Sequence, residues 1–233
     1  MHDAPIRAVS FDFGQTLASL DASMLLTKLV RRGMRADVGH LERALPVAWA
    51  AYDAAVRAGI AGHPWKLFMR TLLEEARCEP ASAVDAAVDF LWDDQPTANL
   101  WRRPIAGMIE LCRELKSDGM RIGILTNSEG RAAELVAELG WAGIFDTVVD
   151  SGRVGVEKPD PRIFAMMAEQ LEHPQNEIVH VGDSLGADVK GAVRAGMRAV
   201  WFGGRAADAP EGVLVCAAAT DLREALAALR AGT

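Results

Sequence analysis

The chain of 233 residues has little cysteine, no long apolar run and no excess of positive charge. Its three cysteines, Cys78, Cys112 and Cys216, form no CxxC pair, so we expect small core residues rather than a disulfide framework or a zinc site. No apolar run reaches the ~20 residues that span a bilayer. The first residues lack the basic-then-apolar pattern of a signal peptide, which favours a cytoplasmic location. A formal net charge of -7 argues against a general nucleic-acid binder.

Hydrophobic residues make up 50% of the chain, which is enough for one domain with an insertion. Short apolar segments alternate with helical patterns, which predicts right-handed βαβ crossovers and an α/β fold with a doubly wound, mostly parallel Rossmann-like sheet. The expected strands are residues 7–12, 121–127, 147–150, 178–182 and 198–202. The expected helices are residues 105–116, 129–139, 161–171 and 186–195, followed by an edge strand at 213–216 and a closing helix at 221–229.

Residues 20–100 interrupt this alternation with a long stretch that is rich in alanine, leucine, arginine and glutamate. Helices are expected at residues 22–32, 38–58, 65–76 and 81–92, separated by glycine and proline breaks. The stretch is too long to be a simple connection. We therefore predict an all-α cap domain at 20–100, inserted into a core domain made of 1–19 and 101–233.

Polar side chains cluster where the predicted strands end. Ligands of open α/β sheets bind at the carboxyl ends of the strands, so these side chains are expected to meet at one edge. They are Asp12, Thr126, Asn127, Lys158, Asp183 and Asp188.

Three carboxylates so close together repel one another unless a cation joins them. Mg²⁺ is a hard cation that takes oxygen ligands, so it is the expected cofactor. Asp12, Asp183 and the backbone carbonyl of Gly14 are candidate Mg²⁺ ligands, and Asp188 can orient a coordinated water.

The remaining groups suit a transfer reaction. The carboxylate of Asp12 can attack phosphorus or carbon and form a covalent intermediate. The hydroxyl of Thr126 can donate to a phosphate oxygen, and Lys158 can balance the charge of the nucleophile and of the transferring group.

These motifs together resemble the haloacid dehalogenase-like hydrolase superfamily from end to end. The matches are Asp12 with Thr16, Leu125-Thr126-Asn127, Lys158-Pro159-Asp160-Pro161, and Asp183 with Asp188 before Gly191-Ala192 and Ala195-Gly196-Met197. The resemblance implies a Mg²⁺-dependent hydrolase that acts on a small phosphorylated metabolite through an aspartyl-phosphate at Asp12. Thr126, Asn127 and Lys158 are then expected at the phosphate. The helical insertion resembles the subgroup with phosphoglycolate phosphatases, phosphonate hydrolases and dehalogenases.

The departure from the family pattern is Gly14, where phosphatases of this family carry a second aspartate. The resemblance gives that acid the role of protonating the leaving oxygen and activating water, which is worth about 10²–10⁴ in rate. Three explanations stay open. A cap residue or a water replaces the acid; the leaving group needs no proton, as with an acyl phosphate, a halide or a C–P bond; or the protein binds phosphate compounds and turns them over slowly.

Several residues have a functional and a structural interpretation. In the cap, Arg43, His63 and Lys66 are candidate substrate-binding residues, although Arg43 lacks a distinctive surrounding motif and residues 62–66 also fit a helix start. The cap tryptophans either fill its core or line its boundary with the core domain. His180 alternates with apolar residues and fits a satisfied core histidine.

Near the motifs, Asp160 before Pro161 fits a helix N-cap. Ser184 suits either a metal site or a cap. The stretch from Gly191 to Met197 suits close helix packing.

Two rival functions accompany the leading one. The first is carbon chemistry, as in a haloacid dehalogenase or a phosphonate hydrolase. The second is a weakly catalytic protein that binds phosphate ligands on the same scaffold. The expected partner is a small molecule, with no nucleic acid and no membrane, and the protein is expected to be a monomer or a homodimer.

Overall fold

The computed structural model describes residues 5–58 and 64–232. The chain divides into two compact units, which we call the sheet unit (Met1–Ser19 with Arg102–Thr233) and the helical unit (Leu20–Trp101). The chain passes between the units after residue 19 and after residue 101. The sequence placed these boundaries after residues 19 and 100.

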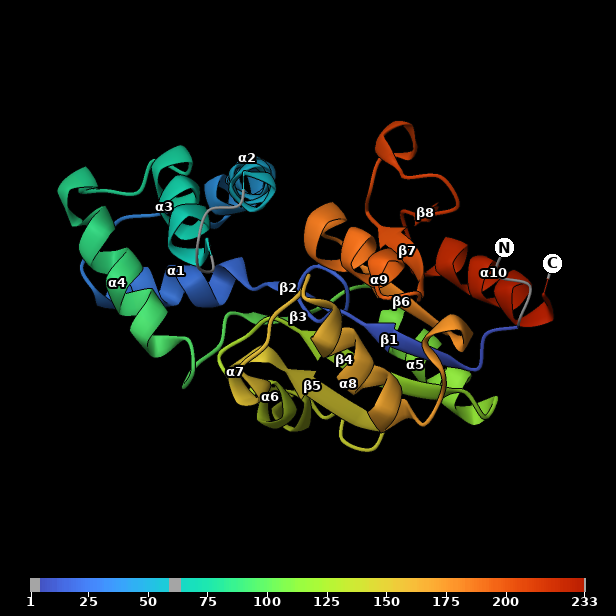
Figure 1. The fold of residues 1–233 in the computed structure, drawn as a ribbon. Helices are drawn as coiled ribbons and strands as arrows, with labels where there is room; N and C mark the ends of the chain where they lie inside the picture. Colours follow the sequence, from blue (N-terminus) through green and yellow to red (C-terminus); the bar gives the residue numbers. More distant parts are fainter. Residues whose placement is uncertain (1–4, 59–63, 233) are drawn as a thin grey trace. The chain divides into compact units, whose positions relative to one another are not determined.

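The sheet unit is built on a six-stranded parallel sheet with the strand order β5-β4-β1-β6-β7-β8 (Figure 1). The strands are β1 (Ala8–Phe11), β4 (Arg121–Thr126), β5 (Thr147–Asp150), β6 (Ile178–Gly182), β7 (Arg198–Phe202) and β8 (Leu214–Cys216). All of β1, β4 and β6 is buried apart from the first residue of β4, because helices cover both faces of the sheet, and most residues of these strands are apolar. The predicted α/β fold class is confirmed.

Strand β1 lies in the middle of the sheet, and its end is the natural place for a ligand. Phe11 pairs with Ile124 of β4 on one side and with Val181 of β6 on the other. The chain leaves β4 toward β5 and leaves β6 toward β7, so the connections diverge on the two sides of β1. Such a switch in direction opens a crevice at the carboxyl ends of the strands. Asp12 follows β1 directly at this point.

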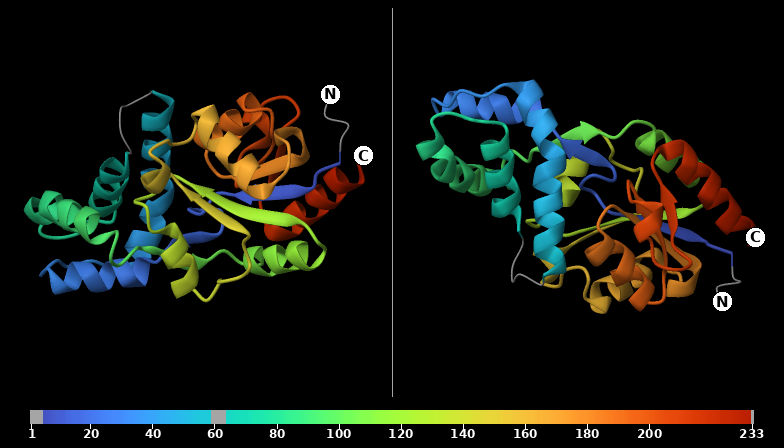
Figure 2. Two further views of the ribbon diagram at one scale, coloured as in Figure 1. Left: turned by 60° about the horizontal axis from the view of Figure 1, so that its bottom comes forward. Right: turned by 90° about the horizontal axis from the view of Figure 1, so that it is seen from above.

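Helices cover both faces of the sheet, with α5 packed against α10 on one face and α8 against α9 on the other (Figures 1 and 2). The helices of this unit are α5 (Met108–Ser117), α6 (Ala132–Glu138), α7 (Ser151–Val154), α8 (Pro161–Leu171), α9 (Lys190–Arg194) and α10 (Ala219–Ala231).

Local contacts set the start and the packing of these helices. Asp160 caps α8, with Pro161 at its first position, as predicted. A Cβ on Gly191 of α9 would lie 2.8 Å from the Phe164 ring, which confirms close helix packing there.

The helical unit contains α1 (Ala22–Arg31), α2 (Val38–Arg57), α3 (Trp65–Glu75), a 3₁₀ turn η1 (Ala81–Ala83) and α4 (Val84–Asp94). Its tryptophans pack within the unit: the Trp49 ring lies 4.2 Å from that of Phe68, and the Trp65 ring lies 5.5 Å from that of Trp92. Trp101 contacts the same cluster; Trp65 and Trp101 are buried, whereas Trp49 and Trp92 are partly exposed. Cys78, Cys112 and Cys216 are buried free thiols, as expected. No helix in the described ranges is long and apolar enough to cross a membrane.

The structure differs from the sequence-based elements mainly at the element ends. A two-stranded sheet of β2 (Ala18–Leu20) and β3 (Trp101–Pro104) was not predicted, and neither was α7. Helix α5 begins at Met108 rather than at residue 105, because Gly107 before it has a φ of 77°. Helix α6 begins after Gly130, which has a φ of 92°. Left-handed backbone excludes both glycines from a right-handed helix.

Candidate active site

The site is organised around Lys158, whose ammonium group is buried between two carboxylates. Its Nζ atom donates to Oδ1 of Asp12 at 2.6 Å, to Oδ1 of Asp188 at 2.6 Å and to the carbonyl oxygen of Leu125 at 2.8 Å. A lysine has three donors, so each one is used. The side chain is 2% exposed. The predicted meeting of Asp12, Lys158 and Asp188 at the strand ends is therefore present in the structure.

Asp188 reaches this position because the neighbouring residue, Gly182, has no side chain. Gly182 ends β6, and a Cβ on it would lie 2.3 Å from Cγ of Asp188. A single π-helical turn, η3 (Leu185–Val189), then carries Asp188 back to the strand end. The backbone N–H of Ser184 donates to Oδ2 of Asp188 at 2.9 Å, and the Ser184 hydroxyl caps the turn. The structure thus shows the capping role for the Ser184 side chain.

Charge and burial oppose each other strongly at this site. Burial raises the pKa of Asp12 to about 6, with Lys158 acting to lower it and Asp188 to raise it. Burial acts to raise the pKa of Asp188 as well, but Lys158 and His180 together hold this pKa well below its usual range. For Lys158, burial acts to lower the pKa, and the two carboxylates more than reverse this effect. The lysine therefore stays charged, and Asp12 is the carboxylate that carries the uncompensated charge.

The remaining acid is Asp183, which follows β6 and is half-buried. Asp12, Asp183 and Asp188 each offer an oxygen, and these oxygens lie within 4.8 Å of one another. When ionised, these acids carry three negative charges against the single positive charge of Lys158. The excess of two charges and the all-oxygen donor set fit a divalent hard cation. Both oxygens of Asp188 accept hydrogen bonds, and Asp12 and Asp183 as Mg²⁺ ligands stay predictions.

Gly14 lies in the tight loop that follows Asp12. The backbone N–H groups of Leu17 and Ala18 both donate to the carbonyl oxygen of Phe13, and Gln15 has a left-handed φ of 53°. This loop brings the chain back on itself within a few residues. A glycine at position 14 provides no acidic side chain, and its backbone carbonyl as a Mg²⁺ ligand stays a prediction.

Thr126 is the last residue of β4 and Asn127 follows it, and Asn127 has a clear structural role. Its Nδ2 donates to the carbonyl oxygen of Lys158 at 2.9 Å, and its Oδ1 accepts from the Lys158 backbone N–H at 2.8 Å. The Asn127 side chain thus fixes the backbone of Lys158. Phosphate binding at Asn127 stays a prediction. Thr126 is 5% exposed at the end of its strand.

Two side chains that support the acids had no clear signal in the sequence. His180 of β6 is fully buried and hydrogen-bonds to Asp188 through Nε2 at 3.2 Å. Trp201 of β7 donates from its indole N–H to the carbonyl oxygen of Asp183 at 2.7 Å. The prediction that His180 is a satisfied core histidine is confirmed, although one partner is an acid of the site. Apolar flanking residues made both side chains look like ordinary core residues.

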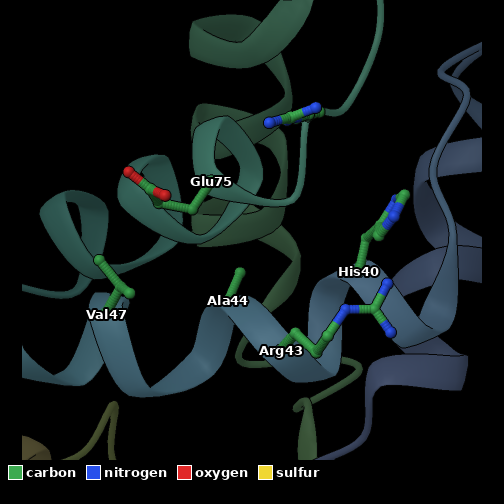
Figure 3. Close-up of a pocket in the computed structure, with 6 residues that line it drawn as sticks. His40, Arg43, Ala44, Val47 and Glu75 are labelled. Atoms are coloured by element: carbon green, nitrogen blue, oxygen red, sulfur yellow. The ribbon is translucent and has the colours of Figure 1, made fainter.

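The helical unit contains the other predicted substrate-binding residues. Arg43 lies on α2 and lines a surface pocket of about 330 Å³ together with His40, Ala44, Val47, Glu75 and Arg77 (Figure 3). Lys66 is exposed and forms an ion pair with Asp89 at 2.7 Å. His63 lies outside the described residues. The other cap lysine, Lys28, is buried and paired with Asp94 at 2.7 Å, which is a structural role.

Comparison with known proteins identifies the family. A sequence profile described as haloacid dehalogenase-like hydrolase matches residues 6–196. The chain is 32% identical over 196 residues to the glyceraldehyde 3-phosphate phosphatase of Methanopyrus kandleri, covering 82% of each chain. It is 34% identical over 169 residues to the phosphoserine phosphatase of Thermus thermophilus, covering 70% of this chain and 65% of the relative.

Solved structures show the same fold. The putative HAD-hydrolase YfnB from Bacillus subtilis, bound to magnesium, matches with a TM-score of 0.73 at 18% identity and covers 96% of this chain and 99% of its own. A HAD phosphatase from Thermococcus onnurineus matches with a TM-score of 0.61 at 25% identity, covering 95% of this chain and 98% of its own. Together with the profile match, these results show that the chain belongs to the haloacid dehalogenase-like hydrolases and is a hydrolase.

Proposed function

We propose that this hydrolase is a Mg²⁺-dependent phosphatase that acts on a small phosphorylated metabolite, with Asp12 as the nucleophile. The observation that carries the proposal is the buried Lys158 between Asp12 and Asp188, with Asp183 beside them. Three carboxylates that share one ammonium are costly to bury unless a cation joins them. The phosphatase names of two relatives support the same reaction class.

The reaction proceeds in two displacements. In the first, a carboxylate oxygen of Asp12 bonds to phosphorus while the bond from phosphorus to the leaving oxygen breaks, giving an aspartyl-phosphate and a leaving oxyanion. In the second, water attacks phosphorus, the bond to Asp12 breaks, and inorganic phosphate leaves with the carboxylate restored. Lys158 offsets the negative charge of the nucleophile as it approaches the phosphate, and Thr126 donates to a phosphate oxygen.

In this proposal, Asp12 and Asp183, together with the backbone carbonyl of Gly14, would hold a divalent cation. When bound, the cation would supply positive charge that draws the phosphate to the carboxylate and offsets the charge of the transition state. Asp188, which is ion-paired with Lys158, would orient a water at this position.

The leaving oxyanion needs a proton that no side chain at position 14 can provide. Substrates whose leaving group is stable without a proton therefore suit this site best. We expect acetyl phosphate and p-nitrophenyl phosphate to be hydrolysed faster than alkyl phosphates, because Gly14 has no acidic side chain that could protonate the leaving oxygen. Equal rates across leaving groups would mean that another group protonates the leaving oxygen.

The helical unit acts as the cap that selects the substrate in this proposal. Arg43 is its best candidate for contacting an anionic substrate group, because it lines a pocket while Lys66 is held by Asp89. His63 is a further candidate from the sequence. Replacing Arg43 by methionine is expected to raise KM with little change in kcat, and an unchanged KM would remove Arg43 from the substrate site.

The decisive test is Asp12→Asn, which removes the nucleophile and keeps the shape of the side chain. The purified variant should lose Mg²⁺-dependent phosphatase activity and retain the circular dichroism spectrum of the wild type. Asp208→Asn, an exposed aspartate of the same unit, is the matched control and should keep full activity. Phosphatase activity in Asp12→Asn would refute the proposed nucleophile.

Gly14 also favours a second candidate, carbon chemistry of the haloacid dehalogenase type, because a departing halide needs no proton. The acid cluster favours the phosphatase, since halide displacement has no need for two extra carboxylates. Halide release from a 2-haloacid without Mg²⁺ would establish the second candidate. A weakly catalytic phosphate-binding protein is the outcome if a broad panel of phosphate substrates is bound but not turned over.

A further inference from the structure

A row of buried, hydrogen-bonded polar side chains leads from the middle of the sheet to the acids of the site. The two steps of the proposed phosphatase reaction do not use these side chains. Ser10 of β1 and His180 of β6 are register partners in the parallel sheet, and both are fully buried. The Ser10 Oγ atom lies 2.8 Å from Nδ1 of His180. On the other side of the ring, Nε2 lies 3.2 Å from Oδ1 of Asp188. The chain of contacts therefore runs from the middle of the sheet to the acid pair.

The chemistry of the partners decides which nitrogen of His180 carries the proton. Asp188 is ion-paired with Lys158, so its Oδ1 is a carboxylate oxygen and can only accept. Nε2 must then carry hydrogen and donate to Asp188. In the neutral imidazole, Nδ1 is consequently an acceptor, and the Ser10 hydroxyl donates to it. The Ser10 hydroxyl can donate as well as accept, so its contact with Nδ1 is compatible with the tautomer that holds Asp188.

The surroundings of the ring fix its orientation as well. The edge of the imidazole meets the Phe164 ring with a centroid separation of 5.4 Å and an interplanar angle of 88°. Burying the polar side chains of Ser10 and His180 is unfavourable unless both are hydrogen-bonded. A leucine or phenylalanine in place of His180 would fill the same space without this cost. Packing of the core alone therefore does not require a histidine and a serine at these two positions.

The effect on the site follows from how Asp188 is held. Its Oδ1 accepts from both His180 and Lys158, and its Oδ2 accepts from the Ser184 backbone. The same lysine nitrogen holds Oδ1 of Asp12. A carboxylate fixed at both oxygens gives the ammonium one preferred position, and this position sets the orientation of the nucleophile.

We propose that His180 is a positioning residue for the hydrolase reaction: in the Nε2–H tautomer that Asp188 requires, with Ser10 as the donor to Nδ1, it orients Asp188 and through Lys158 the nucleophile Asp12. This inference rests on the proposed function for its catalytic consequence. The tautomer and the hydrogen bond to Asp188 do not depend on the reaction catalysed.

The first experiment reads the tautomer directly. Nitrogen-15 NMR of the wild-type protein, with the His180 signals assigned by their loss in His180→Gln, should show a protonated Nε2 and an unprotonated Nδ1. In Ser10→Ala, which removes the donor to Nδ1, the Nδ1 resonance should shift. A proton on Nδ1 with a bare Nε2 in the wild type would overturn the proposal.

The second experiment compares two replacements of His180. Glutamine places an amide donor near the position of Nε2, whereas leucine has no donor. We expect His180→Leu to weaken Mg²⁺ binding, measured by titration calorimetry, and to lower kcat, each by about 10–100-fold, as for other side chains that orient metal ligands. His180→Gln should recover most of both. His173→Leu, which removes a histidine paired with Glu177 outside the site, is the control and should change neither.

The outcomes separate the two ideas. If the folded His180→Leu protein binds Mg²⁺ and turns over like the wild type, or if glutamine is no better than leucine, His180 is a core residue and the inference is wrong. If the wild type hydrolyses no phosphate compound while the tautomer and the Mg²⁺ affinities behave as stated, the proposed function fails and the positioning role of His180 stands.

Discussion

The burial of Asp12 has a consequence for stability that can be measured without a substrate. Asp12 is 8% exposed and its carboxylate shares Lys158 with Asp188, so its charge is poorly compensated when no cation is bound. Replacing Asp12 by asparagine keeps the shape and removes the charge. The variant should therefore be inactive but more stable than the wild type in the absence of metal.

The pKa of Asp12 gives the size and the sign of this effect. The pKa rises from an ordinary value of 3.8 to about 6 in the folded protein. At about 1.4 kcal/mol per pH unit, this rise destabilises the folded wild type by about 3 kcal/mol at pH 7 and above. Between pH 3.8 and about 6 the folded state binds more protons than the unfolded state, so wild-type stability falls as the pH rises through this range. Below pH 3.8 the carboxyl is neutral in both states, and the two proteins should be equally stable.

The assay is urea unfolding followed by circular dichroism in EDTA at pH values from 4 to 8. The asparagine variant should gain about 3 kcal/mol at pH 8, which corresponds to a rise in Tm of about 6–12 °C for a protein of this size. The gain should vanish near pH 4. Asp208→Asn serves as the control and should follow the wild type at every pH.

Adding Mg²⁺ provides the complementary measurement. A ligand that binds only the folded protein raises the free energy of unfolding, and the rise is larger the tighter the ligand binds. Because the variant lacks the Asp12 carboxylate, Mg²⁺ should stabilise the wild type more than the variant. Two results would refute the reasoning. One is a variant that is no more stable than the wild type at pH 8 in EDTA. The other is an equal stabilisation of both proteins by Mg²⁺, which would show that Asp12 does not hold the cation.

Three further substitutions test the surrounding site. Lys158→Met leaves two buried carboxylates without their ammonium and should lower the free energy of unfolding, measured in urea, by about 3–5 kcal/mol. Lys190→Met, at an exposed lysine, is the control and should not lower it. Wild-type stability in Lys158→Met would contradict the observed ion pairs. Gly182→Ala pushes on Asp188 and should lower stability by about 1–3 kcal/mol together with kcat, and an unaffected kcat would show that Asp188 tolerates the shift. Gly14→Asp supplies the absent acid and should raise alkyl phosphate hydrolysis by about 10²–10⁴ relative to p-nitrophenyl phosphate. An equal gain for both substrates would show that proton transfer was not what the site lacked.

The local pattern of the sequence was sufficient to predict much of the sheet unit. Continuous apolar runs predicted the strands, and β5, β6 and β7 have the predicted bounds. Asp12 directly after the first strand, Lys158 before the helix that follows β5 and Asp188 in the segment after β6 were predicted as neighbours, because the carboxyl ends of parallel strands share one edge. Helix starts were less accurate, since a glycine does not show in the sequence whether its φ is positive, as it is for Gly107 and Gly130.

The sequence by itself determined which residues could carry the chemistry, since these follow from residue type and from position relative to a strand. Only the tertiary structure decided how they are paired. Lys158 and Asp12 are 146 positions apart in the chain, and no local pattern states that one ammonium bridges two acids. The same holds for Asn127, whose side chain holds the Lys158 backbone, and for His180, whose ring meets Asp188. Strand formation depends on neighbouring residues, whereas a buried hydrogen bond depends on which distant chains the packed core brings within about 3 Å of each other.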